Sequence, residues 1–165
     1  MILSGRDIQW YIEQKKLVIS PVEENQFQQN GVDLILEEVD ISGHTIKRNF
    51  AGIDIQLPSK SSIFVKGDFY LGRTREYFEM PDDLMAFVEL RSSWARRGIM
   101  LPPTIVDAGF KGTLTLEIVS FQEQMIPIGQ RFAHLIFAKT TGPCAPYKGK
   151  YQGQREITKA IEDKK

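Results

Sequence analysis

The sequence predicts an all-β domain with one or two short helices. Short runs rich in Val, Ile, Leu and Phe recur along the chain and are of strand length. The 13 glycines and 8 prolines separate these runs at roughly even intervals, as turns between strands do. A chain of 165 residues with 42% hydrophobic residues builds one core. We therefore expect a single domain over residues 1–165, arranged as a barrel, sandwich or jelly roll.

The first element is an N-terminal helix. Ser4 followed three residues later by Asp7 is a variant of the capping box, in which each side chain caps the other's backbone. Apolar residues then recur at helical spacing over residues 8–12. The pattern predicts one short helix that runs through Lys16.

Strands follow the helix. The predicted strands are Leu17–Ile19, Val32–Leu36, Ile53–Leu57, Ser62–Val65, Phe69–Leu71, Met85–Leu90, Thr113–Val119 and Phe132–Ala138. A second helix of one or two turns is expected at Ser92–Arg97, with Gly98 as its left-handed cap. The tail at 157–165 has alternating charges and few apolar residues, so we expect a flexible C-terminal segment at about 147–165.

Composition excludes several classes of protein. Lys and Arg number 21 and Asp and Glu number 21, so the basic surface typical of a duplex-binding protein is not expected, and nucleic acid is an unexpected partner. Cys144 is the single cysteine and can form no intrachain disulfide, which favours a cytoplasmic protein. No run approaches the roughly 18 apolar residues of a membrane span, so no membrane association is expected.

A zinc site is not expected either. Pro143-Cys144 resembles the beginning of the Pro-Cys-x-x-Cys motif of zinc deaminases, but Tyr147 stands where the second cysteine would be. His134 lies between apolar neighbours in a predicted strand, where a structural histidine is commoner than a metal ligand.

The densest polar cluster lies at 91–98. Ser92 and Ser93 open the short helix, and Arg91 and Arg96 lie on either side of them. Hydroxyl and guanidinium groups together suit a phosphate. An N-capped surface turn with ordinary arginines explains the same pattern equally well.

Residues 106–112 form a turn after an apolar run. Asp107 precedes Gly109 and Gly112, and both glycines can adopt positive φ and let other groups approach the main chain closely. An aspartate before a glycine turn is usually only a turn residue, so this motif is weak evidence by itself.

The next segment alternates as a half-buried strand does. Thr113, Thr115 and Glu117 share one face, and the leucines and isoleucine between them share the other. A carboxylate among apolar neighbours is a candidate for a raised pKa and for acid–base catalysis. A solvent-facing ion pair across two strands is the alternative for Glu117.

Residues 146–154 combine aromatic, cationic, amide and glycine residues near the C-terminus. Such a segment can close over a nucleotide and supply stacking, charge and hydrogen bonds. A basic surface loop is the alternative interpretation.

Together these segments resemble the dCTP deaminase/dUTPase superfamily. The resemblance rests on R-S-S-x-A-R at 91–96, V-D-A-G-F-K-G at 106–112, T-L-T-L-E at 113–117 and Y-x-G-K-Y-Q-G-Q at 147–154, with support from M-I-L-S-G-R-D-I at the start and N-G-V-D-L at 30–34. It covers nearly the whole chain. It implies a β-clip fold, the distorted jelly-roll barrel of the trimeric dUTPases, and a homotrimer with nucleotide sites between subunits.

The resemblance also implies roles for individual residues. Ser92 and Arg96 match residues that hold the triphosphate and the reactive water, and Asp107 matches the aspartate at the sugar. The other substrate-binding residues implied are Arg91 and Ser93 at the phosphates, Thr115, Leu116 and Glu117 at the pyrimidine, and Tyr147, Lys150 and Gln154 in the segment that closes over the nucleotide.

The activity implied is zinc-independent deamination of dCTP to dUTP and ammonia, in the supply of dUMP and dTTP precursors. Glu117 would be the proton carrier, and Mg²⁺ would enter with the triphosphate. The alternatives are a dUTP diphosphatase with Asp107 as the catalytic carboxylate, and a bifunctional dUMP-forming enzyme. A non-catalytic deoxynucleotide-binding module is a further alternative. Glu117 favours deamination, because relatives that only hydrolyse dUTP can lack a carboxylate on that strand.

Overall fold

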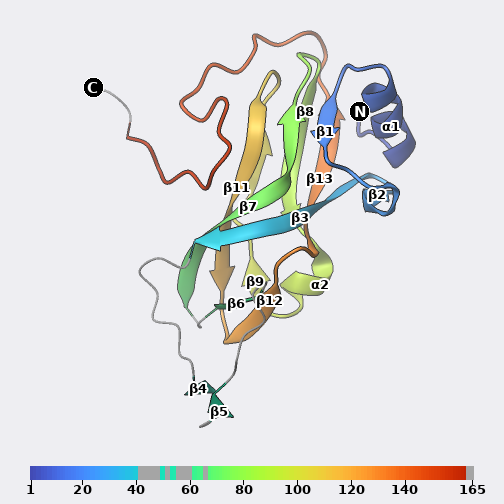
Figure 1. The fold of residues 1–165 in the computed structure, drawn as a ribbon. Helices are drawn as coiled ribbons and strands as arrows, with labels where there is room; N and C mark the ends of the chain where they lie inside the picture. The colour runs from blue at the N-terminus through green and yellow to red at the C-terminus, as the bar shows by residue number, and fades with distance from the viewer. Residues whose placement is uncertain (41–48, 51–52, 55–60, 65–66, 163–165) are drawn as a thin grey trace.

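A curled antiparallel sheet of nine strands forms most of the protein (Figure 1). The computed structural model describes residues 1–162 except 41–48, 51–52, 55–60 and 65–66. The main path of the sheet runs β10-β8-β13-β3-β7-β11-β9, with β1 beside β7 and β2 beside β3. Its strands are β1 (Val18–Ser20), β2 (Phe27–Gln28), β3 (Gly31–Asp40), β7 (Asp68–Glu79), β8 (Leu84–Leu90), β9 (Ile99–Met100), β10 (Thr104–Val106), β11 (Lys111–Ser120) and β13 (Arg131–Lys139).

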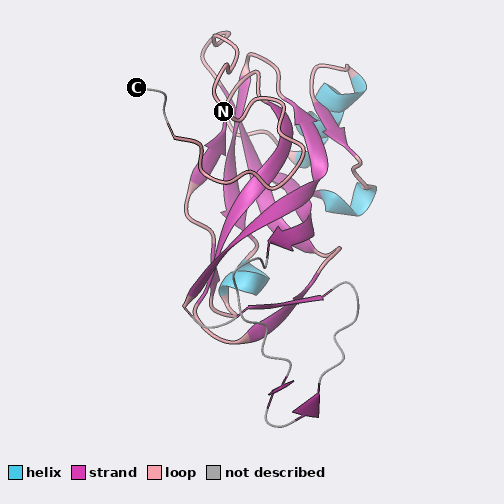
Figure 2. Cartoon of the chain, turned by 60° about the vertical axis from the view of Figure 1, so that its left-hand side comes forward, coloured by secondary structure: helices cyan, strands magenta, loops and turns pink. Residues whose placement is uncertain are grey.

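The remaining elements are short. Two small sheets pair β12 (Gln124–Pro127) with β6 (Ser61–Phe64) and β4 (Asn49–Phe50) with β5 (Ile53–Asp54). The helices are α1 (Gly5–Glu13), the 3-10 turn η1 (Glu24–Gln26) and α2 (Ser92–Ala95). Figure 2 shows how little of the chain is helical, which confirms the predicted all-β class.

Helix α1 begins as the sequence predicts. The Asp7 amide donates to Ser4 Oγ at 3.2 Å, and the Ser4 amide donates to Asp7 Oδ2 at 3.0 Å, so the capping box is complete. The helix ends at Glu13, earlier than the predicted end at Lys16. The reason is that Lys15 adopts a left-handed conformation with φ of 55°, which turns the chain towards β1.

Strand β3 changes partner along its length and so curls the sheet (Figure 1). Residues 32–35 pair with β13, and residues 36–40 pair with β7. At the change, the Ile35 amide donates to both carboxylate oxygens of Glu76, each at 3.1 Å, and Gln26 Nε2 donates to Glu76 Oε1 at 2.7 Å. Glu76 is fully buried, and this burial raises its pKa to about 7.

Strand β7 is much longer than predicted. The sequence placed a strand at 69–71, but the strand continues to Glu79 with every second side chain buried. Charged residues at 73, 75 and 76 hid this alternation. Arg73 and Arg75 lie on the outer face, where they pair with Glu38 at 3.2 Å and Glu37 at 2.7 Å. The predicted strands at 53–57 and 62–65 extend partly outside the described residues.

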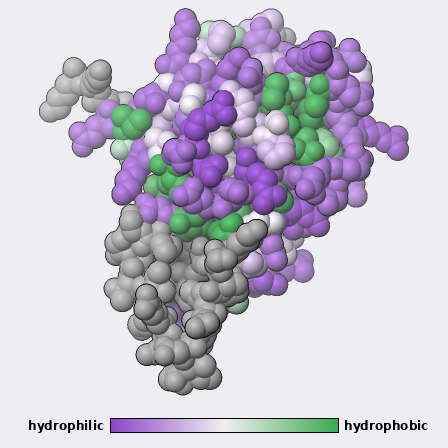
Figure 3. Space-filling view, in the orientation of Figure 1, coloured by the Kyte–Doolittle hydropathy of each residue, from purple (hydrophilic) through white to green (hydrophobic). Residues whose placement is uncertain are grey.

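The core lies inside the curl of the sheet, whereas part of the outer surface is apolar. The largest fully buried side chains include Tyr70, Phe78, Phe132 and Phe137. Figure 3 shows several apolar areas on one face, separated by polar side chains. None of the helices in the described part of the chain is long and apolar enough to span a bilayer.

Candidate active site

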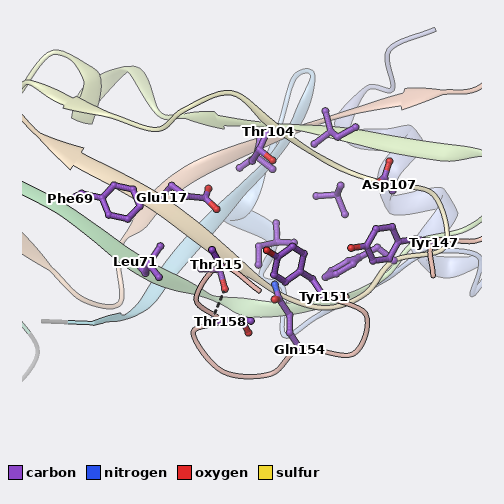
Figure 4. Close-up of a pocket in the computed structure, with 16 residues that line it drawn as sticks. Phe69, Leu71, Thr104, Asp107, Thr115, Glu117, Tyr147, Tyr151, Gln154 and Thr158 are labelled. Carbon is purple, nitrogen blue, oxygen red and sulfur yellow. Dashed lines mark hydrogen bonds between the residues drawn. The ribbon is translucent and has the colours of Figure 1, made fainter. Parts of the chain in front are cut away.

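A cavity of about 440 Å³ lies beside β11, under the C-terminal segment (Figure 4). Strands β7, β10 and β11 supply one wall, and the chain after Tyr147 supplies the other. The residues labelled around it in Figure 4 are Phe69, Leu71, Thr104, Asp107, Thr115, Glu117, Tyr147, Tyr151, Gln154 and Thr158. Five of the sequence-predicted site residues therefore share one cavity: Asp107, Thr115, Glu117, Tyr147 and Gln154.

The Glu117 carboxylate points into this cavity (Figure 4). Alternation along β11 directs Leu116 and Ile118 into the core and leaves Glu117 half-buried on the cavity side. Within the described part of the chain, no side chain donates a hydrogen bond or forms an ion pair with it, so the cross-strand ion pair is not observed. Burial of the carboxylate raises its pKa, as the sequence predicted.

The neighbours of Glu117 on β11 differ from the prediction in two respects. Leu116 is only 1% exposed, packs in the core and does not line the cavity. Thr113 was expected to share the open face with Thr115, but it is buried, because Gln154 covers it and donates from Nε2 to the Thr113 carbonyl at 2.9 Å. Thr115 Oγ1 accepts a hydrogen bond from the Thr158 amide at 3.1 Å.

Asp107 lies on the opposite side of the cavity from Glu117 (Figure 4). It follows β10 directly and is exposed. The glycines after it have φ of 77° at Gly109 and 147° at Gly112, as the turn motif predicted. A Cβ at Gly109 would lie 2.7 Å from Pro146 Cα, and one at Gly112 would lie 2.7 Å from the Gln154 carbonyl oxygen. The close approach that these glycines allow is therefore used by the protein's own C-terminal segment.

The C-terminal segment is hydrogen-bonded along the turn and the start of β11. The Tyr147 amide donates to the Ala108 carbonyl at 2.9 Å, and the Thr113 amide donates to the Gln154 carbonyl at 2.9 Å. Gln154 Oε1 is buried and has no hydrogen-bond partner among the described residues. Lys150 is exposed, donates to the Ile161 carbonyl and does not line the cavity.

The serine–arginine motif lies elsewhere in the chain. Ser92 and Arg96 are exposed and do not line the cavity. Arg91 and Ser93 line a second, polar hollow together with Arg97 and other residues. Helix α2 lies away from the C-terminal segment in both ribbon views (Figures 1 and 2). One chain thus holds the predicted site residues in two separate places.

Comparison with models of known protein families identifies the family of the chain. A family model described as dCTP deaminase-like matches residues 2–140. The chain belongs to the dCTP deaminase-like family.

Relatives in this family match the chain over nearly its full length. A protein of Sulfolobus islandicus rod-shaped virus 1 named "Probable deoxyuridine 5'-triphosphate nucleotidohydrolase" is 45% identical and covers 99% of this chain and 100% of its own length. A Metallosphaera sedula protein named dCTP deaminase is 43% identical and covers 96% of each chain. The two names differ although the identities are nearly equal.

Solved structures show the same fold. The dCTP deaminase of Agrobacterium tumefaciens matches with a TM-score of 0.63 at 21% identity, over 82% of this chain and 47% of that one, so this chain spans just under half its length. The EIAV dUTPase matches with a TM-score of 0.52 at 17% identity, over 81% of this chain and 98% of that one. The dUTPase-type fold that the sequence predicted is confirmed.

Several cavity residues of this dCTP deaminase-like protein were not predicted. Leu71 lies directly opposite Glu117 across β7 and β11, and Phe69 lies opposite Val119. These pairs follow from the register between the two strands, and the register cannot be read from the sequence of either strand. Thr104 and Thr158 carry no motif that could have identified them.

Proposed function

We propose that this protein is a dCTP deaminase that releases ammonia and forms dUTP. The observation that carries the proposal is the Glu117 carboxylate, which points into a cavity, is partly desolvated and has a raised pKa. Desolvation makes this carboxylate a stronger base than an exposed one, and a general acid–base catalyst must accept and return a proton. The name of the Metallosphaera sedula relative supports the choice of substrate.

In this reaction Glu117 takes a proton from water while the water oxygen bonds to C4 of cytosine. The proton then passes to N3. Glu117 next transfers the proton of the new C4 hydroxyl to the amine, so that the C4–N bond breaks, ammonia leaves and the C4 carbonyl of dUTP forms. Two residues that line the cavity supply polar groups that can hold the nucleotide. They are Thr115, through Oγ1, and Gln154, whose buried Oε1 has no hydrogen-bond partner among the described residues. A buried acceptor without a partner is costly, so a ligand N–H or O–H there would be stabilising.

Binding of the phosphates requires a second group of residues. Arg91, Ser92, Ser93 and Arg96 supply hydroxyl and guanidinium donors, but in one chain they lie apart from the Glu117 cavity. We infer that the site is completed between subunits of a homotrimer, as the family resemblance implies. Phe87 on β8 and Ile105 on β10 support self-association, because they are register partners and are 38% and 50% exposed.

Mg²⁺ is proposed to bind with the triphosphate. Asp107 offers an exposed carboxylate at the cavity, an oxygen donor of the kind that Mg²⁺ prefers, directly or through water. No group of three or more His, Cys, Asp and Glu residues that could hold a metal by itself occurs within the described ranges. When bound, the cation would neutralise charge on the phosphate oxygens. The absence of zinc and the cytoplasmic location stay predictions from the sequence.

Hydrolysis of dUTP to dUMP and pyrophosphate is the second candidate. It is favoured by the viral relative, whose name describes a dUTP nucleotidohydrolase. Asp107 is the carboxylate that could activate water for this reaction, because it lies across the cavity from Glu117. A bifunctional enzyme would use both carboxylates.

Incubation of the purified protein with dCTP and, separately, with dUTP in the presence of Mg²⁺ tests the proposal. Ammonia from dCTP supports deamination, pyrophosphate from dUTP supports the second candidate, and both products from dCTP indicate the bifunctional enzyme. The Glu117→Gln variant should bind dCTP but release no ammonia, whereas Glu13→Gln, which is exposed at the end of α1 and lines neither hollow, should retain activity. Ammonia release at the wild-type rate by Glu117→Gln would contradict the assigned role.

A further inference from the structure

Asp33 is a buried carboxylate that contacts three basic side chains. Its side chain is only 3% exposed. Its Oδ2 lies 2.9 Å from Arg91 Nε and 3.4 Å from Arg131 Nη1, and its Oδ1 lies 2.9 Å from His134 Nδ1. Neither guanidinium contact at Oδ2 has the direction of a good hydrogen bond, so charge attraction dominates there. None of the proposed reaction steps uses this group.

Arg91 connects this carboxylate to α2. It is the residue directly before the helix, and its Nη1 donates to the Arg131 carbonyl at 3.3 Å. Trp94 Nε1 donates to the same carbonyl at 3.0 Å, and its ring packs 5.6 Å from the Phe132 ring. Both ends of α2 are thus attached to the start of β13. The side chain of Arg91 is 29% exposed, and its direction is set by Asp33 together with the Arg131 carbonyl.

The pairing with arginine fixes the position of the buried Asp33 carboxylate. Taking a carboxylate out of water is costly, and nearby guanidinium groups offset that cost. Asp33 is also fixed from its backbone, since Gln26 Nε2 donates to the Asp33 carbonyl at 2.8 Å and bridges to Glu76. The pair therefore joins a rigid strand to a segment in which Ser92, Ser93 and Arg96 are exposed to solvent.

We propose that Asp33 is a positioning residue for phosphate binding: it fixes Arg91 and, through it, the Ser92–Ser93 hydroxyls that receive the triphosphate. This inference rests on the proposed function, because it assumes that the 91–96 motif binds phosphates. It assigns no contact between Asp33 and the nucleotide. Its consequence is that loss of the Asp33 charge weakens binding of the phosphates and spares binding of the nucleoside.

The test measures two ligands with the full-length protein. Tripolyphosphate and deoxycytidine are titrated by calorimetry into the wild type, Asp33→Asn, and the control Asp83→Asn. Asp83 contacts Tyr11 and Lys139 and lines neither hollow. We expect Asp33→Asn to bind tripolyphosphate about tenfold more weakly and deoxycytidine equally well, with both affinities unchanged in the control. The two arginines freed are each about one-third exposed, so the variant should fold.

A double-mutant cycle shows whether Asp33 acts through Arg91. Adding Asp33→Asn to Arg91→Ala should weaken tripolyphosphate binding no further than Arg91→Ala alone, because the partner is already absent. Additive losses would overturn the inference, as would unchanged tripolyphosphate affinity in a folded Asp33→Asn protein. Equal losses for both ligands would indicate a general structural role and would also overturn it.

Two further outcomes are distinguishable. If Asp33→Asn fails to fold or changes its assembly, Asp33→Glu replaces it as the test variant, because it keeps the charge but displaces it. We expect Asp33→Glu to bind tripolyphosphate several-fold more weakly and deoxycytidine equally well. Unchanged tripolyphosphate affinity would overturn the inference. The binding assay depends on neither reaction. Suppose that the wild type converts neither dCTP nor dUTP, but binds tripolyphosphate with an affinity that falls in Asp33→Asn. That result would refute the proposed function and leave the positioning role of Asp33 standing.

Discussion

Replacement of Glu76 by Gln should change how the stability of the protein depends on pH. Glu76 has no exposed surface, and its pKa is raised from 4.5 to about 7, chiefly by burial. The folded protein therefore binds a proton more tightly than the unfolded chain does. The tighter proton binding stabilises the folded protein. This stabilisation is complete below pH 4.5 and is lost as the pH rises towards 7.

The size of the effect follows from the two pKa values. A difference of about 2.5 units corresponds to about 3 kcal/mol, at about 1.4 kcal/mol per unit. The amide side chain of the Glu76→Gln variant imitates the protonated acid: its oxygen can accept from Ile35 and Gln26, and it does not titrate. The free energy of unfolding of the wild type should thus fall by about 3 kcal/mol relative to Glu76→Gln, mostly between pH 5 and 7.

Urea unfolding of both proteins at a series of pH values from 4 to 8 measures the difference directly, because other titrating groups cancel. Glu79→Gln on the same strand is the matched control. The Lys111 ammonium lowers the pKa of Glu79, so Glu79 has no part in the loss of wild-type stability above pH 5. Glu79→Gln should therefore show the same fall in the free energy of unfolding above pH 5 as the wild type. Parallel pH profiles for the wild type and Glu76→Gln would refute the argument that burial controls this carboxyl group.

Three other changes test the site. Arg96→Ala should lower kcat/KM for dCTP at least tenfold without altering the melting temperature, because the side chain is exposed; unchanged steady-state kinetics would remove Arg96 from the mechanism. Gly112→Ala would place a Cβ 2.7 Å from the Gln154 carbonyl oxygen, so limited proteolysis should cut the C-terminal segment faster than in the wild type, and an equal rate would contradict that contact. A chain truncated after Arg155 loses the hydrogen bond from the Thr158 amide to Thr115 and should bind deoxycytidine several-fold more tightly in calorimetry, whereas weaker binding would show that the tail helps to hold the nucleoside.

The fold could be predicted from local patterns wherever those patterns match the burial. The Ser4–Asp7 capping box fixed the start of α1, and the alternation of β11 gave its two faces. The length of β7 could not be predicted, because the buried Glu76 and the paired Arg73 and Arg75 make its pattern look polar. Their partners are 35 to 50 residues away in sequence, and local periodicity carries no information about them.

Only part of the site could be predicted, because sequence motifs do not show how distant segments are arranged. The motifs identified Asp107, Thr115 and Glu117, which share the cavity. Neither spacing nor composition shows that Ser92 and Arg96 lie outside it, since that depends on how α2 is attached to β13. The role of Leu71 as the residue opposite Glu117 follows from the β7–β11 register, which the sequence does not display.

The separation of α2 from the Glu117 cavity has a consequence for mixtures of chains. If each site takes its carboxylate from one subunit and its arginine from the next, Glu117→Gln and Arg96→Ala damage different halves of the site. Each variant alone would have no intact site. Trimers assembled from both would contain sites built from two undamaged halves, so two inactive proteins should restore activity to each other when they are unfolded and refolded together.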